Sequence, residues 1–252
     1  MGKIIDGKNI IKSFGEGSEK TIVLNKISIA IEEGEFVSIM GPSGSGKSTL
    51  MYILSGMDNY DEGEVLFEKK DLSKLKDKEL SDVRREEMGF IFQQPSLLKN
   101  LNILDNIIFT SVRSNKKEIK SITEKGKALM KKVGLEGLEK REISKVSGGQ
   151  LQRAGICRAL MNDPKVIFGD EPTGALNSKS AEEIIKILSE INNEGTTIVL
   201  VTHDPKVAAQ TERIMFMKDG NIVSELKQSK YDGNNIEERI EKVNSKMREI
   251  GV

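Results

Sequence analysis

The sequence predicts an α/β fold, and three observations support that prediction. A glycine-rich loop at residues 41–49 lies between a short apolar segment and a helical one, which is the order around a phosphate-binding loop. Short apolar segments alternate with turns over residues 3–40, as in an antiparallel sheet. A helical stretch of different character follows at about residues 102–160. Together they predict a P-loop NTPase core with an N-terminal antiparallel β subdomain and an inserted α-helical subdomain.

The loop reads Gly-Pro-Ser-Gly-Ser-Gly-Lys-Ser-Thr and fits the pattern G-x-x-x-x-G-K-[ST]. A buried strand is expected at residues 36–40 and a helix at 48–54, so the helix N-terminus would face an anion. Lys47 is placed to reach the β- and γ-phosphates, and the Ser48 hydroxyl to ligate Mg²⁺. The predicted nucleotide contacts from this loop are Ser43, Gly44, Ser45, Gly46, Lys47, Ser48 and Thr49.

Composition excludes several classes of protein. The 252 residues carry 39 Lys plus Arg and 39 Asp plus Glu, so no nucleic-acid partner is predicted. The single cysteine, Cys157, allows no disulfide framework within the chain and is expected to pack inside a helix. No apolar run approaches the ~20 residues of a membrane span, and the N-terminus lacks a signal-peptide core. We therefore expect a protein that is soluble by itself and reaches a membrane only through a partner.

Phe14 is the aromatic side chain of interest in the predicted N-terminal sheet. Adenine has a π-face, and stacking on a base is worth about 1–3 kcal/mol in other proteins. We predict that Phe14 stacks on adenine. The alternative is a phenylalanine that packs in the core or against a turn.

Gln93 follows an expected charged helix at residues 77–87 and an expected strand at 88–92. A polar amide at the end of a strand in an α/β sheet is where a ligand-sensing group would lie. A glutamine that only opens a loop is the alternative.

The segment from residue 102 to 142 has apolar residues at helical spacing and many lysines, which predicts a small helical subdomain. Its expected apolar stripe is Ile119, Ile122, Ala128, Leu129 and Val133. Its expected solvated face is Lys116, Lys117, Lys120, Lys125, Lys127, Lys131 and Lys132. A surface that docks a partner is the alternative reading of the lysines.

Ser147, Gly148, Gly149 and Gln150 precede another helical run. A Ser-Gly-Gly turn that caps a helix makes a second anion site, because free N–H groups and the positive end of the helix dipole lie there. Two anion sites on one chain require an explanation.

Two later strands end in polar side chains. The strand at residues 165–171 ends in Asp170 and Glu171, as in a Walker B motif, where Asp170 would hold Mg²⁺ through water and Glu171 would polarise the attacking water. The strand at 196–201 is followed by His203, the only histidine, which is predicted to contact the γ-phosphate. A surface pair of acids and a surface histidine are the alternatives.

These motifs, in this order, resemble the ATP-binding cassette (ABC) family over residues 3–225. The resemblance implies a head-to-tail dimer in which ATP lies between the loop of one subunit and Ser147–Gln150 of the other, which accounts for the second anion site. It also implies ATP and Mg²⁺ as cofactors and a transmembrane permease as partner. The expected catalytic residues are Glu171, His203 and Gln93, and the expected metal ligands are Ser48, Gln93 and Asp170.

Residues 226–252 are predicted to form a polar linker and an amphipathic helix that folds back on the domain, with partner contact as the alternative. Within the family, the chain looks like the branch of macrolide-export, lipoprotein-release and bacitracin-resistance ATPases. Residues 174–178, Gly-Ala-Leu-Asn-Ser, are most similar to the bacitracin-resistance type, which implies a role in resistance to peptide antibiotics. Val146 and Asn177 depart from the family's usual Leu and Asp.

The resemblance implies a cytoplasmic protein held at the inner face of the cell membrane by its permease. One alternative is a soluble cassette ATPase that acts on ribosomes or DNA, but the chain has one cassette and no long heptad insertion. A second is a regulatory subunit that binds nucleotide without hydrolysis, but both Glu171 and His203 are present. A lipoprotein-release or macrolide-export ATPase is the alternative within the branch.

Overall fold

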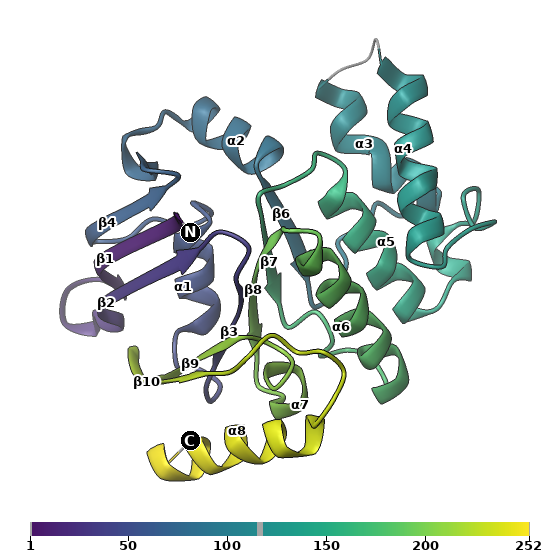
Figure 1. The fold of residues 1–252 in the computed structure, drawn as a ribbon. Coiled ribbons are helices and arrows are strands. Elements are labelled where there is room, and N and C mark those ends of the chain that lie inside the picture. Colours follow the sequence, from purple (N-terminus) through teal and green to yellow (C-terminus); the bar gives the residue numbers. More distant parts are fainter. Residues whose placement is uncertain (1, 115–117, 252) are drawn as a thin grey trace.

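The computed structural model describes residues 2–114 and 118–251, and its strands form two sheets (Figure 1). The smaller sheet is antiparallel, in the order β2-β1-β4-β5, and consists of β1 (Lys3–Phe14), β2 (Thr21–Glu32), β4 (Glu62–Phe67) and β5 (Lys70–Asp71). The larger sheet has the order β10-β9-β3-β8-β7-β6 and consists of β3 (Phe36–Met40), β6 (Met88–Phe92), β7 (Val166–Asp170), β8 (Thr197–Thr202), β9 (Arg213–Lys218) and β10 (Asn221–Lys227). The predicted α/β class with an N-terminal antiparallel sheet is confirmed.

The central strands of the larger sheet are continuous apolar runs because both of their faces are covered. Every residue of β3 and β8 is buried, and the two strands are parallel neighbours. Their register pairs Met40 with Thr202, and β7 next to them pairs Asp170 with Val201. The carboxyl ends of β3, β7 and β8 therefore meet at one edge of the sheet, which is where the polar residues predicted from the sequence follow the strands.

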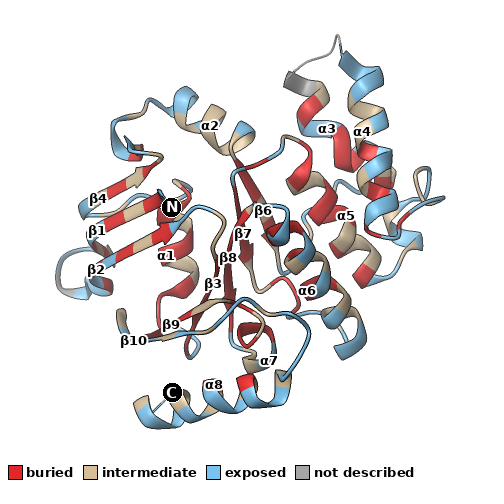
Figure 2. Cartoon of the chain, viewed as in Figure 1, coloured by how far each residue is buried: buried red, intermediate tan, exposed pale blue. Residues whose placement is uncertain are grey.

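Helices cover the larger sheet on both faces. α1 (Lys47–Leu54) lies between the two sheets, and Leu50 and Ile53 share one core with residues of both (Figure 1). α6 (Ser178–Asn193) covers the opposite face through a second core that includes Leu188. Figure 2 shows this burial along the central strands. The remaining helices are α2 (Asp77–Glu86), α3 (Ile103–Ser114), α4 (Ile119–Lys132), α5 (Gly148–Leu160), α7 (Pro205–Ala208) and α8 (Ile236–Ile250).

α3, α4 and α5 pack on one another around a third core and form the helical body at the side of the larger sheet (Figure 1). The predicted apolar stripe is only partly right, because Ile119 is 54% exposed and Ala128 is also exposed. Ile119 is the first residue of α4 and is exposed at the end of the helix. The side chains buried near the other end of α4 are those of Met130, which was not predicted, and Val133. Lys116 and Lys117 lie outside the described residues.

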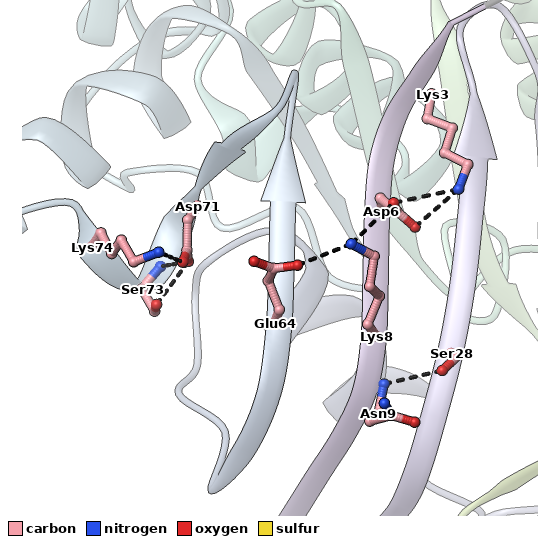
Figure 3. Close-up of polar contacts among 9 residues, drawn as sticks. All are labelled: Lys3, Asp6, Lys8, Asn9, Ser28, Glu64, Asp71, Ser73 and Lys74. Atoms are coloured by element: carbon pink, nitrogen blue, oxygen red, sulfur yellow. Dashed lines mark hydrogen bonds and ion pairs between the residues drawn. The ribbon is translucent and has the colours of Figure 1, made fainter.

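The antiparallel sheet carries charged pairs on its outward face (Figure 3). Lys8 stands opposite Glu64 on β4, and its Nζ lies 3.0 Å from Glu64 Oε2. The backbone N–H of Asn9 donates to Ser28 Oγ at 3.0 Å where the β1–β2 register shifts. These polar contacts belong to the solvated face, so the apolar face of the sheet is left to pack on α1.

The C-terminal helix folds back on the larger sheet, as predicted. Val243 of α8 is buried with Met40 and Phe216, and β10 continues to Lys227 before the linker. Arg239 is buried as well, and its guanidinium donates to the carbonyl oxygens of Ala209 (2.6 Å), Thr211 (3.0 Å) and Ser229 (2.9 Å). Across residues 2–114 and 118–251, no helix has both the length and the apolar character that a membrane span requires.

Candidate active site

A cleft of about 770 Å³ opens at the carboxyl edge of the larger sheet. Residues from segments far apart in sequence line it: Phe14, Val23, Ser43, Gly44, Gly46, Lys47, Ser48, Thr49, Glu171 and His203. The predicted phosphate loop, the aromatic ring, one strand-end carboxylate and the histidine thus share one space. We call it the cleft below.

The loop takes a backbone path that needs glycine. Gly46 has φ +96°, and a Cβ there would lie 2.8 Å from the Val23 carbonyl oxygen. Gly41 has φ +155°, and its Cβ would lie 2.1 Å from the Met217 carbonyl oxygen. Gly46 is the N-cap residue of α1 and has no side chain to accept hydrogen bonds from the first N–H groups of the helix, so these groups are available to a ligand in the cleft. The buried Ser45 hydroxyl also has no hydrogen-bond partner among the described residues. The loop therefore presents donors for an anion.

Lys47 is buried at the floor of the cleft and donates from Nζ to the Pro42 carbonyl oxygen at 2.7 Å. Burial lowers the pKa of its ammonium group, and the carboxylates of Glu171 and Asp170 act in the opposite direction. This hydrogen-bond acceptor is a neutral carbonyl of the loop itself. An incoming phosphate would offer this cation a stronger, charge-assisted hydrogen bond.

Asp170 is the last residue of β7, and its carboxylate accepts hydrogen bonds from two hydroxyl groups of α1. Ser48 Oγ donates to Oδ1 at 2.8 Å, and the Tyr52 phenol donates to Oδ2 at 2.7 Å. Burial and the bond to Asp170 raise the pKa of Tyr52 to about 12. Ser48 and Tyr52 are four residues apart, so they lie on one face of the helix.

Glu171 and His203 line the cleft next to each other. His203 Nδ1 lies 3.0 Å from Glu171 Oε1. Glu171 has φ +45°, a left-handed backbone that costs a non-glycine residue about 1–3 kcal/mol. Its N–H donates to the Val201 carbonyl oxygen at 3.0 Å, so β8 holds the turn in place. The strained turn aims the carboxylate into the cleft.

Phe14 is 48% exposed and lines the cleft. Lys12 Nζ lies 4.9 Å from the ring centroid and is itself held by Asp58 Oδ1 at 3.0 Å and by the Asn59 carbonyl oxygen at 2.6 Å. This cation–π contact restricts the ring before any ligand arrives.

Gln93 is exposed on the loop after β6, outside the residues that line the cleft. Its amide lies beside Gly174, where an added Cβ would be 2.9 Å from Gln93 Nε2 and 3.2 Å from Glu171 Oε2. α5 holds the start of the loop, because Gln152 Nε2 donates to the Phe92 carbonyl oxygen at 2.9 Å. Arg158, also on α5, donates to the Ser96 carbonyl oxygen at 2.7 Å.

Ser147–Gln150 begin α5 and lie outside the cleft of the same chain. Ser147 Oγ accepts from the Gln150 N–H at 3.3 Å, and Gln150 Oε1 accepts from the Ser147 N–H at 2.8 Å. The first intrahelical hydrogen bond runs from the Leu151 N–H to the Ser147 carbonyl oxygen, so the N–H groups of Gly148 and Gly149 have no acceptor within the helix. Gly149 packs on α6, where an added Cβ would be 3.0 Å from Ser180 Oγ.

The two departures from the family pattern have structural roles. Val146 packs against the core of the helical body. Asn177 caps α6, and its Oδ1 accepts from the Ser180 N–H at 2.9 Å.

Sequence reasoning missed Tyr52, Lys12 and Val23. The position of Tyr52 four residues after the loop serine was an available signal, because i and i+4 share a helix face. Lys12 and Val23 had no such signal, since their roles depend on how β1 and β2 pack against the loop.

Comparison with known proteins gives a consistent result. The family model described as ABC transporter matches residues 24–174. The chain is 43% identical over 222 residues to the macrolide export ATP-binding/permease protein MacB of Pasteurella multocida, which covers 88% of this chain but 34% of that protein. It is 42% identical over 224 residues to the bacitracin export ATP-binding protein BceA of Halalkalibacterium halodurans, which covers 88% of each chain. A dimeric post-hydrolysis structure of the ATP-binding cassette MJ0796 with ADP and Pi superposes with a TM-score of 0.80 at 38% identity, over 90% of this chain and all of that one.

Proposed function

The chain belongs to the ABC transporter family, and from that premise we propose that it is an ATP-hydrolysing subunit that dimerises head to tail around two ATP molecules and works through a membrane permease. The observation that carries the proposal is the shared cleft, which collects Phe14, the phosphate loop, Glu171 and His203. The MJ0796 cassette, which has the same fold, binds ADP and Pi.

In this proposal the cleft binds ATP along its length. Phe14 stacks on adenine, and the loop from Ser43 to Thr49 holds the phosphates through backbone N–H groups and Lys47. Glu171 polarises the attacking water, and His203, 3.0 Å away, orients Glu171 and contacts the γ-phosphate. Gln93 completes the set from the neighbouring loop.

The residues beneath the loop fit a Mg²⁺ ion. Ser48 Oγ and Asp170 Oδ1 are oxygen donors 2.8 Å apart, and Gln93 on the loop after β6 would supply a third. In the described part of the chain, no group of three or more His, Cys, Asp or Glu is placed to hold a metal by itself. This suits Mg²⁺, which is bound by one or two carboxylates together with substrate phosphates. When bound, the ion would neutralise charge on the β- and γ-phosphates.

The second copy of the chain explains the position of Ser147–Gln150. Their open N–H groups lie outside the cleft of their own chain, so they are free to serve a nucleotide held by another. A head-to-tail pair supplies that arrangement twice. The dimeric MJ0796 structure is consistent with a pair of cassettes.

A groove of about 440 Å³ where the helical body meets the larger sheet suits the permease. Met57, Leu98 and Phe109 line it and are between 43% and 44% exposed, and Arg84 and Arg158 flank them. An apolar helix end carrying an acidic side chain would match this lining. Binding there would hold the protein at the inner face of the membrane, and Phe92 and Ser96 on the wall of the groove adjoin Gln93.

We further propose that the transported or sensed substrate is a peptide antibiotic. The bacitracin export relative matches this chain over nearly its full length, whereas the macrolide export relative is three times as long as the matched region. Purification of the tagged chain from detergent-solubilised membranes tests the partner. A co-purifying permease is expected, and its absence under conditions that preserve the complex would oppose the proposal.

Glu171→Gln tests the catalytic assignment, with Glu190→Gln on the exposed end of α6 as control. The amide keeps the shape of the side chain but loses the charge, so turnover should fall about 10²–10⁴-fold while ATP binding persists. A stable ATP-dependent dimer should then elute on size exclusion. Hydrolysis within about threefold of both wild type and Glu190→Gln would remove Glu171 from the mechanism.

A further inference from the structure

Asp170 is unusual in this site because both of its carboxylate oxygens are already occupied by hydroxyl groups from one helix. Ser48 takes Oδ1 at 2.8 Å and Tyr52 takes Oδ2 at 2.7 Å. Ser48 belongs to the phosphate loop pattern, so its place there is expected. Tyr52 belongs to no motif, and it is half-buried against the core between the two sheets.

We propose that Tyr52 is a positioning residue for the divalent cation. Its phenol fixes the Asp170 carboxylate so that one carboxylate oxygen serves the ion, and this arrangement favours Mg²⁺ over Ca²⁺. This inference rests on the proposed Mg²⁺–ATP site. When Ser48 ligates the ion instead of donating to Asp170, Oδ1 becomes available to the ion or to its bound water, whereas the phenol keeps Oδ2.

The selectivity follows from the coordination chemistry of the two ions. Mg²⁺ requires a near-octahedral shell, keeps several waters and uses few carboxylate oxygens. Ca²⁺ takes six to eight oxygens and readily accepts both oxygens of one carboxylate. A phenol that occupies Oδ2 permits the first arrangement and obstructs the second. Hydrogen-bond partners that orient a metal ligand typically contribute 10–100-fold to metal affinity.

The ring of Tyr52 makes the bond rigid. Its aromatic body packs against the core cluster that also contains Met51 and Phe168, so the hydroxyl cannot swing away without breaking that packing. Phenylalanine keeps the ring and removes only the hydroxyl. Tyr60 provides a matched control, because it packs against the same core and its hydroxyl has no hydrogen-bond partner among the described residues.

The test measures binding of a non-hydrolysable ATP analogue to the full chain by calorimetry, in Mg²⁺, in Ca²⁺ and in EDTA. For each protein, the ratio of the dissociation constant in EDTA to that in the metal reports the contribution of the ion. In Tyr52→Phe we expect the Mg²⁺ ratio to fall about tenfold and affinity in EDTA to stay within twofold. The Ca²⁺ ratio should rise, because Oδ2 becomes available to a second carboxylate contact. Tyr60→Phe should match wild type throughout.

Three results would overturn the inference. An unchanged Mg²⁺ ratio in Tyr52→Phe would mean that the phenol does not position the ligand, and an equal fall for Ca²⁺ would remove the selectivity. A tenfold loss in EDTA would place the effect on nucleotide or fold instead of on the ion. If wild type itself shows no metal-dependent binding, the proposed Mg²⁺–ATP site fails, which is distinguishable from failure of the role of Tyr52 alone.

Discussion

Replacing Arg239 by methionine should be one of the most damaging changes outside the cleft. Its guanidinium, buried under α8, donates to the carbonyl oxygens of Ala209, Thr211 and Ser229. Burial lowers the pKa of Arg239, with Asp232 and Glu212 among the groups that oppose the shift. Methionine keeps the apolar stem of the side chain but removes every donor.

The magnitude follows from the two fully buried bonds, to Ala209 and Thr211. Each hydrogen bond to a charged group is worth about 1.5–3 kcal/mol, and a buried carbonyl without a donor adds a desolvation cost. Because methionine recovers part of the loss by packing where the stem lay, we expect unfolding to become easier by about 3 kcal/mol. For a chain of this size, that lowers Tm by roughly 6–12 °C.

Thermal and urea unfolding of wild type, Arg239→Met and Arg248→Met would measure the effect. Arg248 lies on the same helix, is 66% exposed and pairs with Glu241, so its loss should stay within about 0.5 kcal/mol. If Arg239→Met is no less stable than Arg248→Met, the three carbonyl bonds do not hold α8 in solution, and the reasoning is refuted.

Three further outcomes are expected. Phe14→Ala should weaken ATP binding by about 1–3 kcal/mol without changing affinity for inorganic triphosphate; equal ATP affinity in calorimetric titrations would exclude stacking. Asn177→Asp should leave the free energy of unfolding within about 0.5 kcal/mol, because both residues cap helices equally well, whereas Asn177→Ala should cost about 1 kcal/mol in urea titrations. Burial raises the pKa of Cys157 to about 12 from 9.0, so its contribution to stability is complete below about pH 9 and is lost as pH rises toward 12. Alkylation of the native chain at pH 8 should therefore be slow and should become fast in denaturant; rapid native labelling would contradict the buried position.

The sequence was sufficient for the elements whose patterns are local. β3 and β6 have the predicted bounds, and α8, from Ile236 to Ile250, lies within the segment predicted to contain an amphipathic helix. The two exposed members of the predicted α4 stripe have a physical cause, because periodicity identifies a face but not which of its residues the neighbouring helices reach. Ile119 lies beyond that reach.

In the candidate site, too, features within local motifs could be predicted, whereas contacts between distant segments could not. The chemistry of phosphate binding constrains the spacing of residues in fixed motifs, such as Lys47 and Glu171, so their places in the cleft could be predicted. The bond from Tyr52 to Asp170 joins residues 118 positions apart, and the left-handed backbone of Glu171 depends on β8. Such features arise only when separate elements pack together.

The hydrogen bonds from α5 to the loop after β6 allow the sequence of that loop to vary. Gln152 and Arg158 donate to the main-chain carbonyls of Phe92 and Ser96, and every amino acid offers the same carbonyl. Side chains of α5 therefore hold the loop by hydrogen bonds to its main chain, and these two bonds do not depend on the loop's own side chains. One helix sequence can thus support many loop sequences, so the side chains beside the groove can vary while the loop keeps its path.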